Sequence, residues 1–89
     1  MPDTITKQTS SHPQDTGSDR LRKGIYRHFK GQYYQVLDVA QHCETEEFMV
    51  VYRALYGERG LWLRPLSNFV DYVERDGTLT PRFQWMAPD

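Results

Sequence analysis

The stretch MVVYRALYGERGLWLRP, residues 49–65, decides the fold, because it joins two apolar segments through a glycine-flanked turn. Residues 48–56 place apolar side chains on both faces of an extended chain, which predicts a central strand of a sheet. Residues 57–60 (GERG) predict a turn. Residues 61–65 (LWLRP) predict the next strand, which ends at Pro65 because proline has no N–H for the ladder.

The segment before this stretch predicts another hairpin. Residues 25–29 and 33–41 are rich in aromatic and β-branched side chains, and Gly31 lies in the turn between them. The alternation in the second run changes face near Asp38, which predicts a β-bulge.

The segment after Pro65 has two open assignments. Residues 66–69 (LSNF) fit one helical turn, and residues 70–85 then predict a last hairpin that turns at Asp76-Gly77. The alternative is a short helix over residues 66–73, whose apolar residues also have helical spacing. Either way, we expect a mainly all-β fold, a small SH3-like antiparallel barrel of about five strands with one short helical turn.

The N-terminal segment differs in composition from the rest. Met1 and Ile5 are its only large apolar side chains, and all twelve aromatic residues of the chain follow it. Such a segment cannot bury enough apolar surface to offset its loss of conformational entropy. We expect a disordered tail over residues 1–20 and a single β-barrel domain over residues 21–89.

Charge and composition bound the class of partner. The net charge is -1 and the pI about 6.3, whereas nucleic-acid-binding domains usually carry a basic excess. The single cysteine, Cys43, excludes an internal disulfide. No apolar run is long enough to span a membrane, and the N-terminus has no secretory signal. We expect a soluble cytoplasmic protein with no membrane partner.

Two cations, Arg53 and Arg64, interrupt the two apolar segments on either side of the turn. If the turn has two or four residues, they lie opposite each other and share one face with Trp62. Like charges in that position are destabilising, so the pair needs a neutralising group. A loop of three or five residues shifts the register by one and removes this argument.

Three interpretations of the arginines are open. In the first, they form ion pairs with Asp38 or the glutamates of residues 44–47, and their stems cover aromatic rings. In the second, they hold a carboxylate or phosphate on which Trp62 or a tyrosine stacks. In the third, the site is catalytic, although no nucleophile–base pair is visible.

Metal and thiol chemistry has little support in the sequence. His28, His42 and Cys43 match no zinc signature. His42 and Cys43 are adjacent, so on an extended chain they point apart. We expect hydrogen-bonded histidines, a free thiol, no metal and no cofactor. Arg82 and Phe83 follow Pro81 and are candidates to bring a third cation to the same edge of the barrel.

A set of motifs extends between residues 23 and 85: YRH at 26–28, KG at 30–31, HCET at 42–45, VYR at 51–53, LWLRP at 61–65 and PRF at 81–83. As a set they resemble DUF family 1653, a small bacterial domain of unknown function. The family pattern at residues 42–45 is usually His-Ser-Glu-Thr, so Cys43 replaces a serine. The resemblance implies a small cytoplasmic bacterial protein, places Arg53 and Arg64 in family motifs, and carries no established activity.

The leading hypothesis is a non-enzymatic binding module with a site formed by Arg53, Arg64, Trp62, Tyr52 and His28. Its ligand is a small anion, or an acidic or phosphorylated protein partner. One alternative is a nucleic-acid-contacting SH3-like domain, whose binding weakens steeply with salt. The other is a small enzyme that uses a histidine as acid–base. The sequence does not specify the oligomeric state, although an exposed edge strand offers a pairing surface to another copy.

Overall fold

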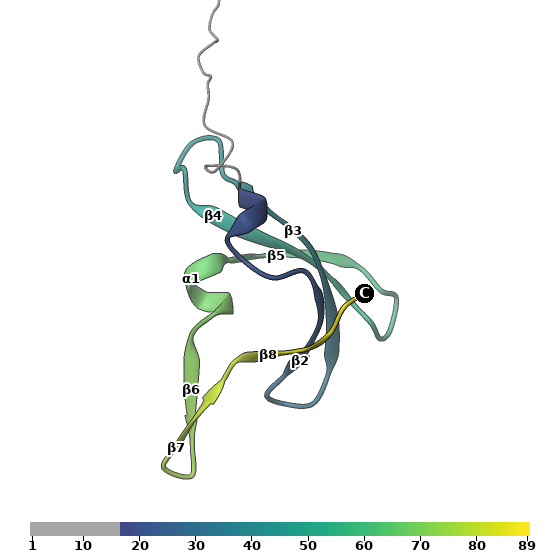
Figure 1. Cartoon of the computed structure of the whole chain (residues 1–89), viewed down its shortest axis with the longest axis vertical. Coiled ribbons are helices and arrows are strands. Elements are labelled where there is room, and N and C mark those ends of the chain that lie inside the picture. Colours follow the sequence, from purple (N-terminus) through teal and green to yellow (C-terminus); the bar gives the residue numbers. More distant parts are fainter. Residues whose placement is uncertain (1–16) are drawn as a thin grey trace, which may run out of the picture.

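The computed structural model describes residues 17–89, which form two antiparallel sheets and one helical turn (Figure 1). The five-stranded sheet has the strand order β5-β4-β3-β2-β8. Its strands are β2 (Gly24–His28), β3 (Tyr33–Gln41), β4 (Phe48–Ala54), β5 (Leu61–Pro65) and β8 (Phe83–Ala87). The helical turn α1 (Leu66–Phe69) follows β5, and β6 (Tyr72–Arg75) pairs with β7 (Thr78–Pro81) in the second sheet.

The mainly β, antiparallel class is confirmed, but the sheet is open. β5 and β8 are its two edges and do not pair with each other, so the expected closed barrel is not formed by the described residues. The chain leaves the sheet after Pro65 and returns at Phe83. Between these points the β6–β7 hairpin projects away from the sheet, at the opposite end from the β3–β4 loop (Figure 1).

Two predictions inside the large sheet are confirmed. β4 lies between β3 and β5, as its two apolar faces indicated. The β3–β4 register shifts between Val36 and Asp38, which is the predicted bulge. The extra residue in β3 changes which of its side chains face the core.

The helical turn is also confirmed, and the alternative helix over residues 66–73 is wrong because β6 begins at Tyr72. The last hairpin is confirmed in part: it turns as expected but ends at Pro81, and Phe83–Ala87 form a separate strand, β8, which pairs with β2. Asp76 and Gly77 have φ angles of 52° and 79°. Positive φ at both central residues is what a two-residue type I′ turn requires.

Residues 1–16, most of the predicted tail, lie outside the described residues. Gly17–Asp19 form a 3-10 turn against β3, where a Cβ on Gly17 would lie 2.3 Å from the carbonyl oxygen of Val39. The Arg20 guanidinium lies 4.0 Å from the centre of the Phe48 ring. Contacts with the sheet therefore begin before the predicted domain boundary. Within residues 17–89, no helix is long and apolar enough to cross a membrane.

The core lies against one face of the sheet and is largely aromatic. The rings of Phe69 in α1 and Phe83 in β8 stack in parallel, with centroids 4.0 Å apart. Tyr26 and Tyr52 meet Phe69 edge-on at 5.3 and 5.6 Å. Aromatic rings bury a large area each, so Phe69 is the main contribution of α1 to the core, and Leu66 packs against the cluster beside it. The buried cluster is Tyr26, Val36, Val39, Val50, Tyr52, Phe69 and Phe83.

Candidate functional site

The β4–β5 loop decides which face each arginine occupies. The Ala54 N–H donates to the Gly60 carbonyl at 3.1 Å, which leaves residues 55–59 as a five-residue loop. Arg53 therefore pairs with Leu61 and not with Arg64. The loop therefore has the odd length under which the two arginines are not expected to pair, and they lie on opposite faces of the sheet.

Arg64 lies on the core face and lines a pocket of about 210 Å³ with Tyr34, Tyr52, Tyr56 and Trp62. The Tyr34 ring meets Tyr52 edge-on at 5.4 Å and Tyr56 at 5.5 Å. The hydroxyls of Tyr34 and Tyr56 are 2.7 Å apart and share a hydrogen bond. β3, β4, β5 and the β4–β5 loop each contribute to the pocket.

A hydrogen-bond chain holds the Arg64 guanidinium in place. Its Nε donates to the Tyr52 hydroxyl at 3.2 Å, and its Nη1 donates to Oδ1 of Asn68. Asn68 donates in turn to Asp71 at 3.4 Å. Arg82 binds Asp71 through both carboxylate oxygens, at 2.6 and 3.3 Å, and this hydrogen bonding lowers the pKa of the carboxyl group.

Several hydrogen-bond donors of the pocket residues have no acceptor among residues 17–89. Within the described chain, Arg64 forms no ion pair and its Nη2 donates no hydrogen bond. The indole N–H of Trp62 makes none either, and the accepting hydroxyl of the Tyr34–Tyr56 pair keeps its own proton. Burial, followed by the Tyr56 hydrogen bond, raises the pKa of Tyr34, which remains neutral near pH 7. The arrangement suits an acceptor-rich anionic group.

Arg53 has a local structural contact instead. On the opposite face, its Nη1 donates to the Arg59 carbonyl at 2.8 Å and so braces the β4–β5 loop. No described carboxylate forms an ion pair with Arg53 or Arg64, and Asp38 forms a salt bridge with Lys23, at 3.9 Å. The ion pairs expected of the two arginines are therefore not formed within residues 17–89. The Arg64 guanidinium does lie over an aromatic ring, 5.4 Å from the centre of Phe83, in keeping with the other part of that interpretation.

His28 lies behind the pocket and does not line it. Its ring packs edge-on against Phe83, with centroids 4.9 Å apart, and its Nδ1 accepts the Lys30 N–H at 3.1 Å. Burial lowers the pKa of His28, and the charges of Arg64, Arg82 and Lys30 lower it further. The imidazole is neutral near pH 7 and supports the aromatic wall through Phe83.

Sequence reasoning missed Asn68 and the pairing of Tyr34 with Tyr56. The sequence does contain a signal for the contact between Asn68 and Arg64. Asn68 follows Arg64 by four residues and lies in the helical turn expected over residues 66–69. Arg82, the expected third cation, binds Asp71 and is not among the pocket-lining residues. Within residues 17–89, no three His, Cys, Asp or Glu side chains gather in a way that could hold a metal ion.

Fold and pocket together define a small, open antiparallel β domain with an aromatic pocket around one arginine. The chain belongs to the family described as Protein of unknown function (DUF1653), whose model matches residues 24–85, which confirms the resemblance. It is similar to the crystal structure of a DUF1653 protein from Bordetella bronchiseptica, with 34% sequence identity and a TM-score of 0.72. That match covers 80% of this chain and 94% of the other. No curated protein matches this chain.

Proposed function

We propose that this protein is a non-enzymatic binding module whose pocket holds one anionic group, a carboxylate or a phosphate. The observation that carries the proposal is the Arg64 guanidinium, which is fixed by Tyr52 and Asn68 and has no carboxylate ion-pair partner among residues 17–89. A fixed guanidinium presents planar N–H donors that match the geometry of both anions. The site comprises Arg64, Tyr52 and Trp62; Arg53 is left out because it lies on the opposite face.

Pocket size limits what is bound. A volume of about 210 Å³ is below the roughly 300–1,000 Å³ of pockets that enclose drug-sized ligands. The pocket therefore suits a small molecule, or one acidic or phosphorylated side chain of a partner. The exposed ring of Trp62 and the rings of Tyr34 and Tyr56 offer stacking surfaces to the portion of the ligand that adjoins its anionic group.

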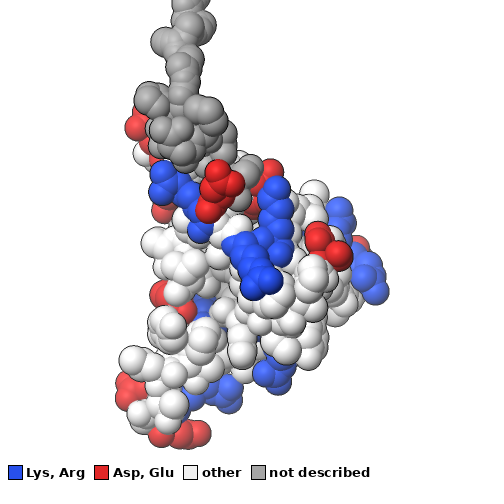
Figure 2. Space-filling view, in the orientation of Figure 1, with Lys and Arg blue, Asp and Glu red and all other residues white. Residues whose placement is uncertain are grey.

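Surface charge supports a local site over a nucleic-acid surface. Figure 2 shows basic and acidic side chains interspersed over the visible face, without a continuous basic stripe. The net charge of -1 agrees with this. A groove that follows a phosphate backbone normally needs several clustered cations.

The proposal is tested by NMR titration of the full chain with acetate, inorganic phosphate, a short acidic peptide and its phosphorylated form. We expect saturable shifts of the Trp62 indole and the Arg64 side-chain signals with at least one of these probes. Arg64→Gln should abolish the shifts and Arg64→Lys should weaken them, because lysine keeps the charge and loses the fork. Arg53→Gln, on the opposite face, is the matched control and should bind as the wild type does.

Two results would overturn the proposal. One is a wild-type spectrum unchanged by all four probes at millimolar concentration. The other is equal loss of binding in Arg53→Gln and Arg64→Gln, which would indicate a diffuse charge effect. Folding of each variant is checked beforehand from the dispersion of its amide spectrum.

A further inference from the structure

β5 is an edge strand whose first three side chains are all large, apolar and exposed. Leu61, Trp62 and Leu63 have 56%, 58% and 62% of their surface exposed, and among the described strands β5 pairs with β4 alone. Natural edge strands are usually protected from pairing by charges, bulges or a covering segment. Trp62 lies on the core face and the two leucines on the opposite face, so both faces of this edge expose apolar side chains. Exposed apolar surface along an unprotected edge indicates an interaction site.

The unpaired backbone groups of β5 belong to the same residues. The hydrogen bond from Ala54 to Gly60 fixes the alternation of the β4–β5 ladder, so Trp62 also bonds to β4. Leu61 and Leu63 consequently direct their N–H and C=O groups away from β4. Each offers one donor and one acceptor at the free edge of the sheet.

We propose that this edge binds a second copy of the chain, with the two β5 strands antiparallel about a two-fold axis at Trp62. In this register Leu61 lies opposite Leu63 of the second copy. The two Leu61–Leu63 pairs created by the two-fold axis exchange four N–H···O bonds. These bonds use every N–H and C=O group that Leu61 and Leu63 direct away from β4 in each copy. Trp62 meets its own counterpart at a non-hydrogen-bonded position, where side chains approach most closely.

The charges of the strand are compatible with this pairing. Arg64 lies opposite Gly60 of the second copy, so no like charges meet across the interface. A net charge of -1 gives two copies little mutual repulsion. Because Trp62 also lines the pocket, the second copy would place its Trp62 beside the pocket mouth and so extend the site.

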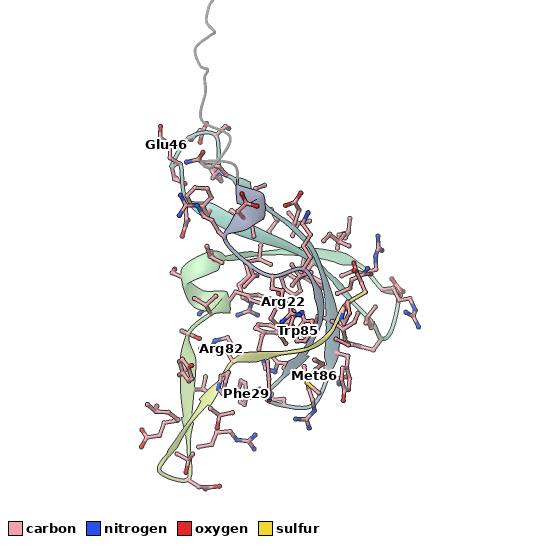
Figure 3. All side chains as sticks on the ribbon, in the orientation of Figure 1. Arg22, Phe29, Glu46, Arg82, Trp85 and Met86 are labelled. Carbon is pink, nitrogen blue, oxygen red and sulfur yellow. The ribbon has the colours of Figure 1, made fainter. Side chains whose placement is uncertain are left out.

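On the other edge strand, β8, the large aromatic side chain is packed against neighbouring residues. The Trp85 ring of β8 lies under the Arg22 guanidinium at 3.4 Å, and its indole N–H donates to the Lys23 carbonyl at 3.1 Å (Figure 3). No described residue covers Trp62 in this way. The interface therefore forms between two β5 edges. An edge this short buries less than the roughly 1,200 Å² of standard interfaces, so the dimer is weak and concentration-dependent.

Sedimentation velocity of the full chain between about 10 μM and 1 mM tests the proposal over the range of weak dissociation constants. We expect the wild type to shift from monomer to dimer, and Leu63→Lys to remain monomeric. Leu79→Lys is the matched control, because Leu79 is a leucine with 69% exposure on β7 and should dimerise as the wild type does. A monomeric wild type at 1 mM, or equal loss of dimer in both variants, overturns the proposal.

Amide hydrogen exchange gives a residue-level readout. As protein concentration rises, the Leu61 and Leu63 amides should become protected, whereas the Trp62 amide, which already bonds to β4, should not change. A dimer without this protection uses another surface and overturns the proposal. Arg64→Gln should still dimerise, so failure of the anion site and failure of the dimer are distinguishable.

Discussion

The two faces of the β4–β5 hairpin give two similar arginines different environments. Arg64 is held over the core face by Tyr52 and Asn68, and it lines a pocket. Arg53 lies on the opposite face and donates to the Arg59 carbonyl in the adjoining loop. The loop between the two strands has an odd number of residues. Because side chains alternate along a strand, this places Arg53 and Arg64 on opposite faces of the sheet. Loop length, more than residue type, determines which arginine is available to a ligand.

The largest expected effect concerns the core face itself. Phe69 is 1% exposed and stacks on Phe83, so Phe69→Ala should destabilise the domain by about 3–5 kcal/mol. Leu61→Ala, on the opposite face with 56% exposure, should change stability by about 0.5 kcal/mol or less. Urea unfolding at a protein concentration too low for association measures both. Similar losses would contradict the assignment of the core to one face.

Replacing each arginine by methionine compares the two faces directly. Arg64→Met removes the donor to the buried Tyr52 hydroxyl and the bond to Asn68, and should cost about 1–3 kcal/mol. Arg53→Met removes one exposed bond to the Arg59 carbonyl and should cost at most about 1 kcal/mol. Chemical denaturation gives both values. A greater loss of stability in Arg53→Met would mean that the Arg53 hydrogen bond to the loop contributes more to folding than the Arg64 hydrogen bonds in the pocket.

The sequence predicted the strands well and their register poorly. Residues 61–65 are β5 as expected, since an apolar run that ends in proline has few other solutions. The register depends on the loop, where Arg59 has a φ of 58°. Few non-glycine residues adopt that conformation. Positive φ angles are expected at glycines. The sequence therefore favoured a shorter turn flanked by Gly57 and Gly60.

The pocket was predictable only in part. Trp62, Arg64 and Tyr52 were expected to contribute, because they lie within one hairpin whose strand order follows from the sequence. Tyr34 reaches the pocket from β3, next to Tyr56 in the β4–β5 loop. That contact depends on the β3–β4 register, on the bulge and on the curvature of the sheet, none of which a periodic pattern specifies.

The pH dependence of stability tests the wall behind the pocket. Burial and the neighbouring cations lower the pKa of His28 below its ordinary value of 6.5. The unfolded chain then binds the proton more readily, so the stability contributed by neutral His28 is complete above pH 6.5 and declines as pH falls below it. Urea unfolding at about pH 7.5 and 5.5 should show this loss in the wild type. His28→Gln should reduce this pH-dependent loss of stability. A loss of the same size in His28→Gln would assign it to other groups.

The smallest expected effect lies in the loop that separates the two arginines. Because Arg59 has a positive φ, Arg59→Gly should relieve backbone strain, offset in part by the greater entropy of the unfolded chain, for a net gain of about 0.5 kcal/mol. Glu58→Gly is the matched control: Glu58 is not among the residues with positive φ, so glycine there brings only the entropic loss. The Arg59 carbonyl that accepts the Arg53 bond is backbone and persists in both variants. Thermal unfolding of the two proteins should therefore move in opposite directions. If Arg59→Gly destabilises as much as Glu58→Gly, the left-handed residue does not set the odd loop, and the separation of Arg53 from Arg64 has another cause.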